Sequence, residues 1–292
     1  MAYELRLGIR IRAPRETVFE HLLTPHHLAR WWCNFAQVEP KPDGKFVFGG
    51  DYAIAQPEGH AFACKFTGGV IRKSVTFAWP LFGAETSVTW DVEDASDGCV
   101  LRATHTNLPT LESTCGSLHD AWRVCLGNLK AVAEGRGDSL RPDHSPVREP
   151  RIKLDLLLDV PRQRAFGALV DPVEIRKWAD PPHEPVVEPQ VGGPFDLGGP
   201  EHGHIEALQM FERLAVDWRE GNRATRFAFR LEEKSGDRCG LYFLHEGFAA
   251  EDAQEIVRLR GRWSDFLVAL KNVLEAGEAG FTDARDAQVV QR

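Results

Sequence analysis

The fold is decided by a stretch of sequence that occurs twice in the chain. Residues 13–32 read APRETVFEHLLTPHHLARWW, and residues 160–179 read VPRQRAFGALVDPVEIRKWA. The identical positions are Pro14 and Pro161, Arg15 and Arg162, Phe19 and Phe166, Leu22 and Leu169, Pro25 and Pro172, and Trp31 and Trp178. An alternating apolar segment precedes each stretch, and a proline then takes the first helical position, where its missing N–H costs nothing. Each copy is therefore expected to open with one strand and two short helices.

The repeat continues on both sides of this stretch. Further matching pairs are Leu5 and Ile152, Leu7 and Leu154, Ile9 and Leu156, Ile11 and Leu158, Trp79 and Trp218, Cys99 and Cys239, His105 and His245, Trp122 and Trp263, Leu126 and Leu267, Leu129 and Leu270, and Lys130 and Lys271. A chain of 292 residues also exceeds what one core usually supports. The predicted organisation is a first domain over 1–136, a linker over 137–149, a second domain over 150–278 and a mobile tail over 279–292.

Each copy reads as several strands followed by one long helix. Val75, Phe77 and Trp79 alternate with polar or small residues, which is typical of an antiparallel sheet covered on one side. The last segment of each copy has apolar residues at helical spacing, from Trp122 to Ala133 and from Ile256 to Leu274. The predicted fold class is α+β. It has two helix-grip domains, each a curved antiparallel sheet wrapped around a long C-terminal helix, with two short helices after the first strand.

These repeated segments resemble a known family. The first stretch, the turns THTNL at 104–108 and LHEGF at 244–248, and the helices WRVCLGNLK at 122–130 and WSDFLVALK at 263–271 are similar to the SRPBCC or START-like helix-grip superfamily. More narrowly, both halves resemble the C-terminal domain of the heat-shock protein 90 ATPase activator. The resemblance implies a cavity between sheet and helix that is suited to an apolar or aromatic ligand. It also makes a chaperone partner an alternative function.

Side-chain size differs between the two copies. The second copy has large inner residues, namely Phe195, Trp218, Phe227, Phe229, Phe243, Trp263 and Phe266. The first has small ones, namely Ala53, Ala55, Ala61, Ala63 and Ala103. This predicts a pocket for a small hydrophobic or aromatic ligand in the first domain; the alternative is that both cores are simply packed. The predicted ligand-binding residues are Trp32, Phe77, Trp79, Trp90, Ala103, His105 and Trp122.

Several of these residues have a second interpretation. His105 recurs as His245, and a structural role at the strand end, hydrogen-bonded to a nearby loop, is the alternative to ligand contact. Trp31 recurs as Trp178 and is expected in the core. Trp32 has Ala179 as its counterpart and is therefore freer to line a pocket or an interface.

The sequence predicts no metal site, no cofactor and no catalytic residues. His26 and His27 are adjacent, so on a helix they point about 100° apart and do not chelate together. HExxH and GxSxG motifs are absent from the sequence. We therefore expect a binding module without catalytic machinery. A cyclase/aromatase-like or hydrolase enzyme of the same fold is the alternative, because such enzymes mainly position a reactive substrate.

Composition indicates an ordinary globular protein with a net charge of −8. Neither half has the surplus of Lys and Arg that nucleic-acid binding requires, and no apolar run reaches the roughly 20 residues of a membrane span. The six cysteines form no CxxC pair, and we expect them to be reduced in a cytoplasmic protein. The two domains are expected to pack against each other as a pseudo-dimer, with a homodimer as a further alternative.

Overall fold

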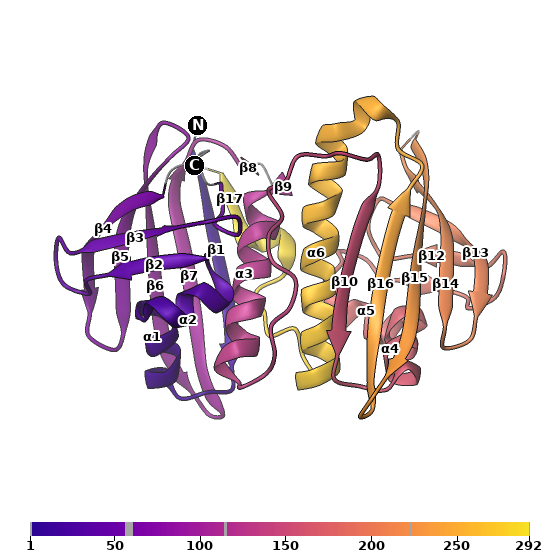
Figure 1. Ribbon diagram of the computed structural model, residues 1–292, viewed down its shortest axis with the longest axis horizontal. Helices are drawn as coiled ribbons and strands as arrows, with labels where there is room; N and C mark the ends of the chain where they lie inside the picture. Colours follow the sequence, from indigo (N-terminus) through magenta and orange to yellow (C-terminus); the bar gives the residue numbers. More distant parts are fainter. Residues whose placement is uncertain (1, 56–60, 114–115, 222, 292) are drawn as a thin grey trace. The chain divides into compact units, whose positions relative to one another are not determined.

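The computed structural model is shown in Figure 1 and describes residues 2–55, 61–113, 116–221 and 223–291. The chain forms two compact units, one of residues 1–145 with 280–292 and one of residues 146–279. Each unit is an antiparallel sheet with two short helices near its start and one long helix, which confirms the predicted α+β fold class. Within the described residues, no helix is both long and apolar enough to cross a membrane.

The first unit has a sheet of order β17-β1-β7-β6-β5-β4-β3-β2 and a separate small hairpin, β8-β9. Its elements are β1 (Tyr3–Ile11), α1 (Arg15–Leu23), α2 (Pro25–Trp31), β2 (Phe35–Val38), β3 (Lys45–Gly49), β4 (Phe62–Val70), β5 (Ser74–Leu81), β6 (Ala84–Ala95), β7 (Gly98–Leu108), β8 (Glu112–Ser113), β9 (Gly116–Ser117), α3 (Leu118–Ala133), η2 (Arg285–Gln288) and β17 (Val289–Gln291).

The second unit repeats this architecture with a sheet of order β10-β16-β15-β14-β13-β12-β11. Its elements are β10 (Ile152–Leu158), α4 (Arg162–Val170), α5 (Pro172–Ala179), β11 (Val186–Val187), β12 (Pro194–Asp196), β13 (His202–Gln209), β14 (Arg213–Glu220), β15 (Arg223–Lys234), β16 (Arg238–Glu246), η1 (Ala250–Asp252) and α6 (Ala253–Ala276).

The short helices begin as the prolines and polar caps require. Pro25 and Pro172 are the first residues of α2 and α5, as predicted, but Pro14 and Pro161 stand one position earlier, at the N-caps of α1 and α4. The N-cap is an equally suitable place, because its N–H makes no intrahelical bond. The long helix α3 is capped by Ser117, whose hydroxyl accepts the backbone N–H of Asp120 at 3.0 Å.

Alternation along the central strands directs apolar side chains to the core. In β5, Val75, Phe77 and Trp79 are buried and alternate with half-buried neighbours, as the sequence pattern predicts. In the first unit these residues form one cluster with the apolar residues of α3, including Trp122 and Leu126. The long helix therefore closes the core against the sheet.

The C-terminal tail differs from the mobile segment that the sequence led us to expect. Strand β17 pairs antiparallel with β1, and the backbone of Arg10 donates to the carbonyl of Gly280 at 2.8 Å. Gln288 is fully buried, and its side-chain oxygen lies 2.8 Å from His119 Nε2 and 3.0 Å from Arg123 Nη1. The guanidinium of Arg123 also lies 3.8 Å from the ring centre of Phe281. The tail therefore completes the sheet edge of the first unit, an interaction that local periodicity does not reveal.

Candidate functional site

An apolar cavity of about 670 Å³ lies in the first unit between α1 and the β4–β5 hairpin. Its walls include Phe19 and Leu23 of α1, and Phe66 and Val75 of the hairpin strands. The complete lining is Glu16, Phe19, Glu20, Leu23, Pro40, Lys41, Pro42, Phe66, Thr67, Gly68, Gly69, Val70, Ile71, Arg72, Ser74 and Val75. This volume lies within the range of small-molecule sites, roughly 300–1,000 Å³.

The shape of the hairpin depends on an irregular strand. The pairing of β4 with β5 shifts register between Phe66 and Gly68, which marks a bulge. Gly69 follows with a φ of +145°, and a Cβ there would lie 2.5 Å from the carbonyl oxygen of Ser74. The turn between the two strands begins at Ile71, a cavity-lining residue that is 93% exposed. The bulge, and the backbone of Gly69 that follows it, therefore shape one wall of the cavity.

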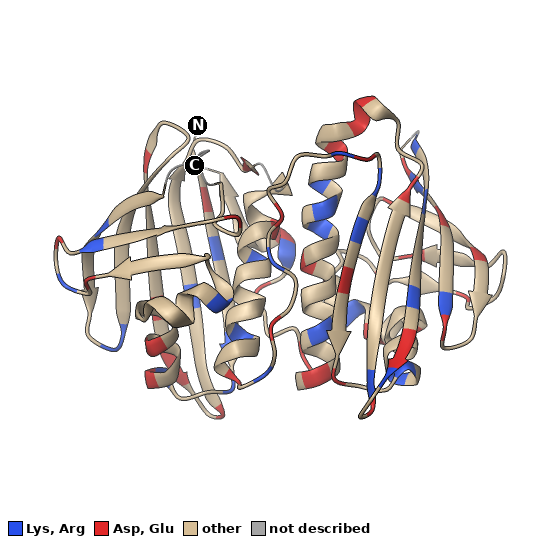
Figure 2. Cartoon of the chain, in the orientation of Figure 1, with Lys and Arg blue, Asp and Glu red and all other residues tan. Residues whose placement is uncertain are grey.

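The rim of the cavity carries charges of both signs. Glu16 and Glu20 come from α1, whose ribbon has segments coloured red for acidic residues in Figure 2, while Lys41 and Arg72 come from the facing loops. Acidic and basic residues are also interspersed along the ribbons of both units (Figure 2). The cavity therefore combines an apolar interior with a polar rim that does not favour one sign of charge.

The seven residues predicted to bind a ligand lie together, but in the core and not in the walls of this cavity. All seven are buried. The Trp32 ring is the centre of the group, with ring centroids 5.5 Å from Trp79, 5.7 Å from Trp90 and 4.9 Å from Trp122. The predicted residues thus form one aromatic cluster behind the cavity.

The cavity and this cluster share a wall. Phe66 lines the cavity and stacks on Phe46 at 5.2 Å, and Phe46 in turn lies 6.1 Å from Trp90. Val75, also in the cavity wall, is the cross-strand partner of Trp90. Trp90 and Phe77, which is the cross-strand partner of Phe66, are therefore the members of the cluster that lie one side chain behind the cavity.

The size difference that predicted an open first core is compensated by neighbouring residues. Ala103 is paired with Trp90 across β6 and β7, whereas the corresponding pair in the second unit is Phe229 and Phe243. The large Trp90 and the small Ala103 of the first unit thus occupy the place that two phenylalanines fill in the second unit. Ala63, counted among the small inner residues, is exposed and does not face the core.

A second exchange of the same kind involves Trp32. Its ring contacts Trp31 at 5.4 Å and Trp122 at 4.9 Å. Its counterpart in the second unit is Ala179, where Phe266 instead contacts the two equivalent tryptophans, at 5.7 Å each. The space between the two tryptophans is filled by Trp32 next to the short helix α2 in the first unit, and by Phe266 of the long helix α6 in the second. A small residue in one copy therefore did not indicate empty space.

Both ring nitrogens of His105 form hydrogen bonds with other side chains of the protein. The indole N–H of Trp122 donates to Nδ1 at 3.2 Å, so in the neutral ring the proton is on Nε2. Nε2 lies 2.8 Å from Thr86 Oγ1, and that hydroxyl donates to the carbonyl of Trp79. Burial lowers the pKa of His105 to about 3. This arrangement favours the structural interpretation, although the partners are core side chains and not a nearby loop.

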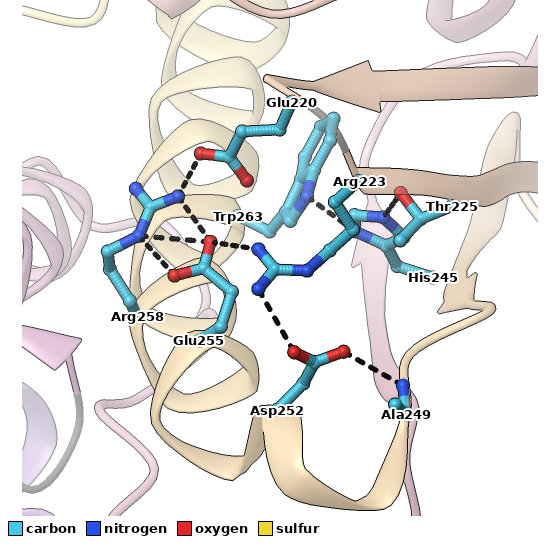
Figure 3. A network of polar contacts seen from close by, with 9 residues as sticks. All are labelled: Glu220, Arg223, Thr225, His245, Ala249, Asp252, Glu255, Arg258 and Trp263. Carbon is cyan, nitrogen blue, oxygen red and sulfur yellow. Dashed lines mark hydrogen bonds and ion pairs between the residues drawn. The ribbon is translucent and has the colours of Figure 1, made fainter.

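The second unit repeats this arrangement, as Figure 3 shows. Trp263 donates to His245 Nδ1 at 3.2 Å, and His245 Nε2 lies 2.8 Å from Thr225 Oγ1. Thr86 and Thr225 were missed in the sequence. The repeat could have revealed them, because Thr86 stands two residues before Val88 and Thr225 stands two residues before Phe227, at the start of the matching apolar alternation.

Three tryptophans of the cluster have unused donors. Among the described residues, the indole nitrogens of Trp32, Trp79 and Trp90 have no hydrogen-bond partner, although all three side chains are fully buried. Leaving a buried donor unsatisfied costs roughly 1–3 kcal/mol. Trp31, in contrast, donates to the carbonyl of His21 at 3.0 Å. These three indole donors are therefore buried without a protein acceptor among the described residues.

A charged network joins the β14–β15 turn of the second unit to the start of α6 (Figure 3). Arg258 contacts Glu220 and Glu255, and Arg223 lies 3.0 Å from Asp252 and 3.6 Å from Glu255. Burial and the nearby Glu255 raise the pKa of Glu220 to about 7. Because each carboxylate of this cluster has an arginine partner, the cluster is best explained as a set of ion pairs that holds the ends of β14 and β15 against the start of α6.

The described cysteines are buried and form no disulfide bond with one another. Burial raises the pKa of Cys33 and of Cys64 to about 12, so neither thiol is activated. Cys115 and His60 lie outside the described residues. No group of three His, Cys, Asp or Glu side chains within the described ranges is arranged to hold a metal ion.

A long helix held against a curved antiparallel sheet, occurring twice, defines the helix-grip class. The sequence pattern of one family of this class, described as "Activator of Hsp90 ATPase homolog 1-like protein", matches residues 12–134 and again 159–275. The chain therefore belongs to this family, which confirms the resemblance seen in its repeated motifs.

Solved structures include similar chains. CalU16 from Micromonospora echinospora is 26% identical over 43% of this chain and 74% of its own, with a TM-score of 0.38. DynU16, a putative protein in the dynemicin biosynthetic locus, is 17% identical over 94% and 98%, with a TM-score of 0.37. PFC0360w, an HSP90 activator from Plasmodium falciparum, is 15% identical over 44% and 98%, with a TM-score of 0.40. The comparison with curated proteins finds no match.

Proposed function

We propose that this protein is a binding module whose first unit takes a small apolar molecule into the cavity between α1 and the β4–β5 hairpin. The observation that carries the proposal is the cavity itself, about 670 Å³ in volume and walled by Phe19, Leu23, Phe66 and Val75. A ligand that removes these side chains from water gains roughly 25 cal/mol for each Å² of apolar surface buried. The aromatic cluster, with the seven residues predicted from the sequence, lies behind the wall of this cavity.

A fluorescent probe tests this function on the full chain. Neutral N-phenyl-1-naphthylamine is expected to bind with one high-affinity site, because it presents an apolar surface of suitable size without a charge. Val75→Phe fills part of the cavity and is expected to weaken binding at least tenfold, or roughly 1.4 kcal/mol. Fluorescence titration measures both affinities.

Val173→Phe is the matched control, because it makes the same exchange at a valine that does not line the cavity. Val173 is 66% exposed on α5 of the second unit, so the added ring stays in solvent. Probe affinity should remain within a factor of two in this variant. A wild-type chain that does not bind the probe, or a Val75→Phe variant that binds it unchanged, would contradict the proposal.

Contact with a heat-shock protein 90 ATPase is a second candidate, favoured by the family to which the chain belongs. The apolar tip of the β4–β5 hairpin, formed by Val70 and the strongly exposed Ile71, is a suitable contact surface. The full chain is then expected to stimulate the ATPase at least twofold, and Ile71→Asp to abolish the stimulation. An ATPase rate that does not change when the wild-type chain is added would exclude this candidate.

A further inference from the structure

The unused indole donors distinguish the first unit from the second. Within the part of the chain that the structure describes, Trp32, Trp79 and Trp90 bury their N–H groups without an acceptor. Their rings are contiguous, with centroids 5.7 Å apart for Trp90 and Trp32 and 5.5 Å apart for Trp32 and Trp79. Three contiguous indole rings therefore have N–H groups without a protein acceptor.

Packing alone does not require these donors. At the positions of Trp90 and Trp32, the second unit has Phe229 and Ala179, and it fills the remaining space with Phe243 and Phe266. The same chain thus contains a version of this core with two fewer indole N–H groups. An indole N–H that is buried without an acceptor lowers stability, and the second unit avoids this loss at the positions of Trp90 and Trp32. The N–H groups of Trp90 and Trp32 in the first unit therefore indicate a function.

We propose that the ligand of the first unit carries neutral carbonyl acceptors on an apolar ring skeleton, and that the indole N–H of Trp90 donates to them, with Trp32 and Trp79 as further donors. This inference rests on the proposed function. Of the three donors, Trp90 has the most direct contact with the cavity wall, because it is the cross-strand partner of the lining residue Val75 and its ring contacts Phe46, which stacks on the lining residue Phe66. The class of the ligand is then an aromatic or alicyclic ketone, quinone or lactone.

The choice of a neutral acceptor follows from the groups around the cluster. The side chains in ring contact with the three tryptophans are aromatic residues and His105, which burial keeps uncharged. A carboxylate moved into such surroundings would lose its hydration without gaining a cation, which is far more costly than burying a carbonyl that accepts hydrogen bonds. The cationic rim residues Lys41 and Arg72 belong to the outer cavity.

Two ligands with one carbon skeleton test the proposal. 1-Tetralone has a carbonyl group that tetralin lacks, and calorimetric titration of the full chain is expected to show about tenfold tighter binding of 1-tetralone, the gain of one hydrogen bond. In Trp90→Phe, which copies Phe229, the preference should fall to about one while tetralin affinity stays within a factor of two. The double variant Trp90→Phe with Ala103→Phe restores the side-chain pair of the second unit and controls for packing.

Indole nitrogen resonances give a second readout. In protein labelled with ¹⁵N-tryptophan, 1-tetralone should shift the Trp90 indole cross-peak downfield, and tetralin should not. Equal binding of both ligands by the wild type, or a preference that survives in Trp90→Phe, would overturn this inference and leave the proposed function standing. If neither ligand binds nor shifts any indole cross-peak, the inference and the proposed function are both overturned.

Discussion

Replacing Lys130 with Met should lower the free energy of unfolding of the first unit by about 3 kcal/mol, because it breaks a buried ion pair on one side only. Lys130 is fully buried near the end of α3, and its Nζ lies 2.7 Å from Glu134 and 3.0 Å from the carbonyl of Arg10. Glu134 also accepts the backbone N–H of Arg12 at 2.8 Å. The pair therefore holds the last turn of the long helix against the end of β1.

The second unit provides an independent copy of this experiment. Lys271 donates to the carbonyl of Leu157 at 2.8 Å and to Glu275 at 2.6 Å, and Glu275 accepts the backbone N–H of Asp159 at 2.9 Å. Lys271→Met should destabilise the second unit by a similar amount. Hydrogen exchange read by mass spectrometry, peptide by peptide, measures each unit separately.

Removal of both charges distinguishes an ion pair from a packing role. In the single variant Glu134 keeps a charged partner, because Arg136 Nη2 lies 2.8 Å from its other oxygen. The double variant Lys130→Met with Glu134→Gln should therefore recover part of the stability that Lys130→Met loses, by removing the carboxylate that Lys130 neutralised. If the double variant is as unstable as the single one, the lysine stabilises the helix end by packing alone, and the ion pair does not explain its burial.

The sequence identified the residues that the fold uses twice, but not their partners. Lys130 and Lys271 were found as matching positions, as were His105 and His245. Their partners include backbone carbonyls, at Arg10 and Leu157, which every residue possesses and which no motif can mark. The repeat therefore predicted which side chains the fold depends on, whereas the structure was needed to show which groups they bind.

Side-chain size was a poor guide to empty space for the same reason. Ala103 suggested a pocket, but its cross-strand partner Trp90 fills the volume. The real cavity lies beside a bulge at Gly68 in β4, and a register shift of this kind depends on how two strands pair. Composition records the volume of each residue, whereas a cavity depends on which residues become neighbours.

Acidification should destabilise both units, each through one histidine. The folded protein keeps His105 neutral down to a pH of about 3, since burial lowers its pKa to about 3, whereas the unfolded chain takes up a proton near the ordinary pKa of 6.5. The stabilising contribution is therefore complete above pH 6.5 and is lost as the pH falls toward 3. Between pH 7 and pH 4 the loss is about 3 kcal/mol for each such histidine.

His105→Gln isolates this effect. Glutamine offers an acceptor to Trp122 and a donor to Thr86 but does not titrate, so the variant should be less stable at pH 7 and lose stability less steeply between pH 6.5 and pH 4. Hydrogen exchange in the peptides of the first unit measures the change of slope. The second unit is the control, because His245, whose pKa burial also lowers to about 3, remains in place there. His245→Gln should reverse the two roles. A His105→Gln variant that keeps the full slope in the first unit would show that other groups cause its acid unfolding, since the remaining histidines are the same in both proteins.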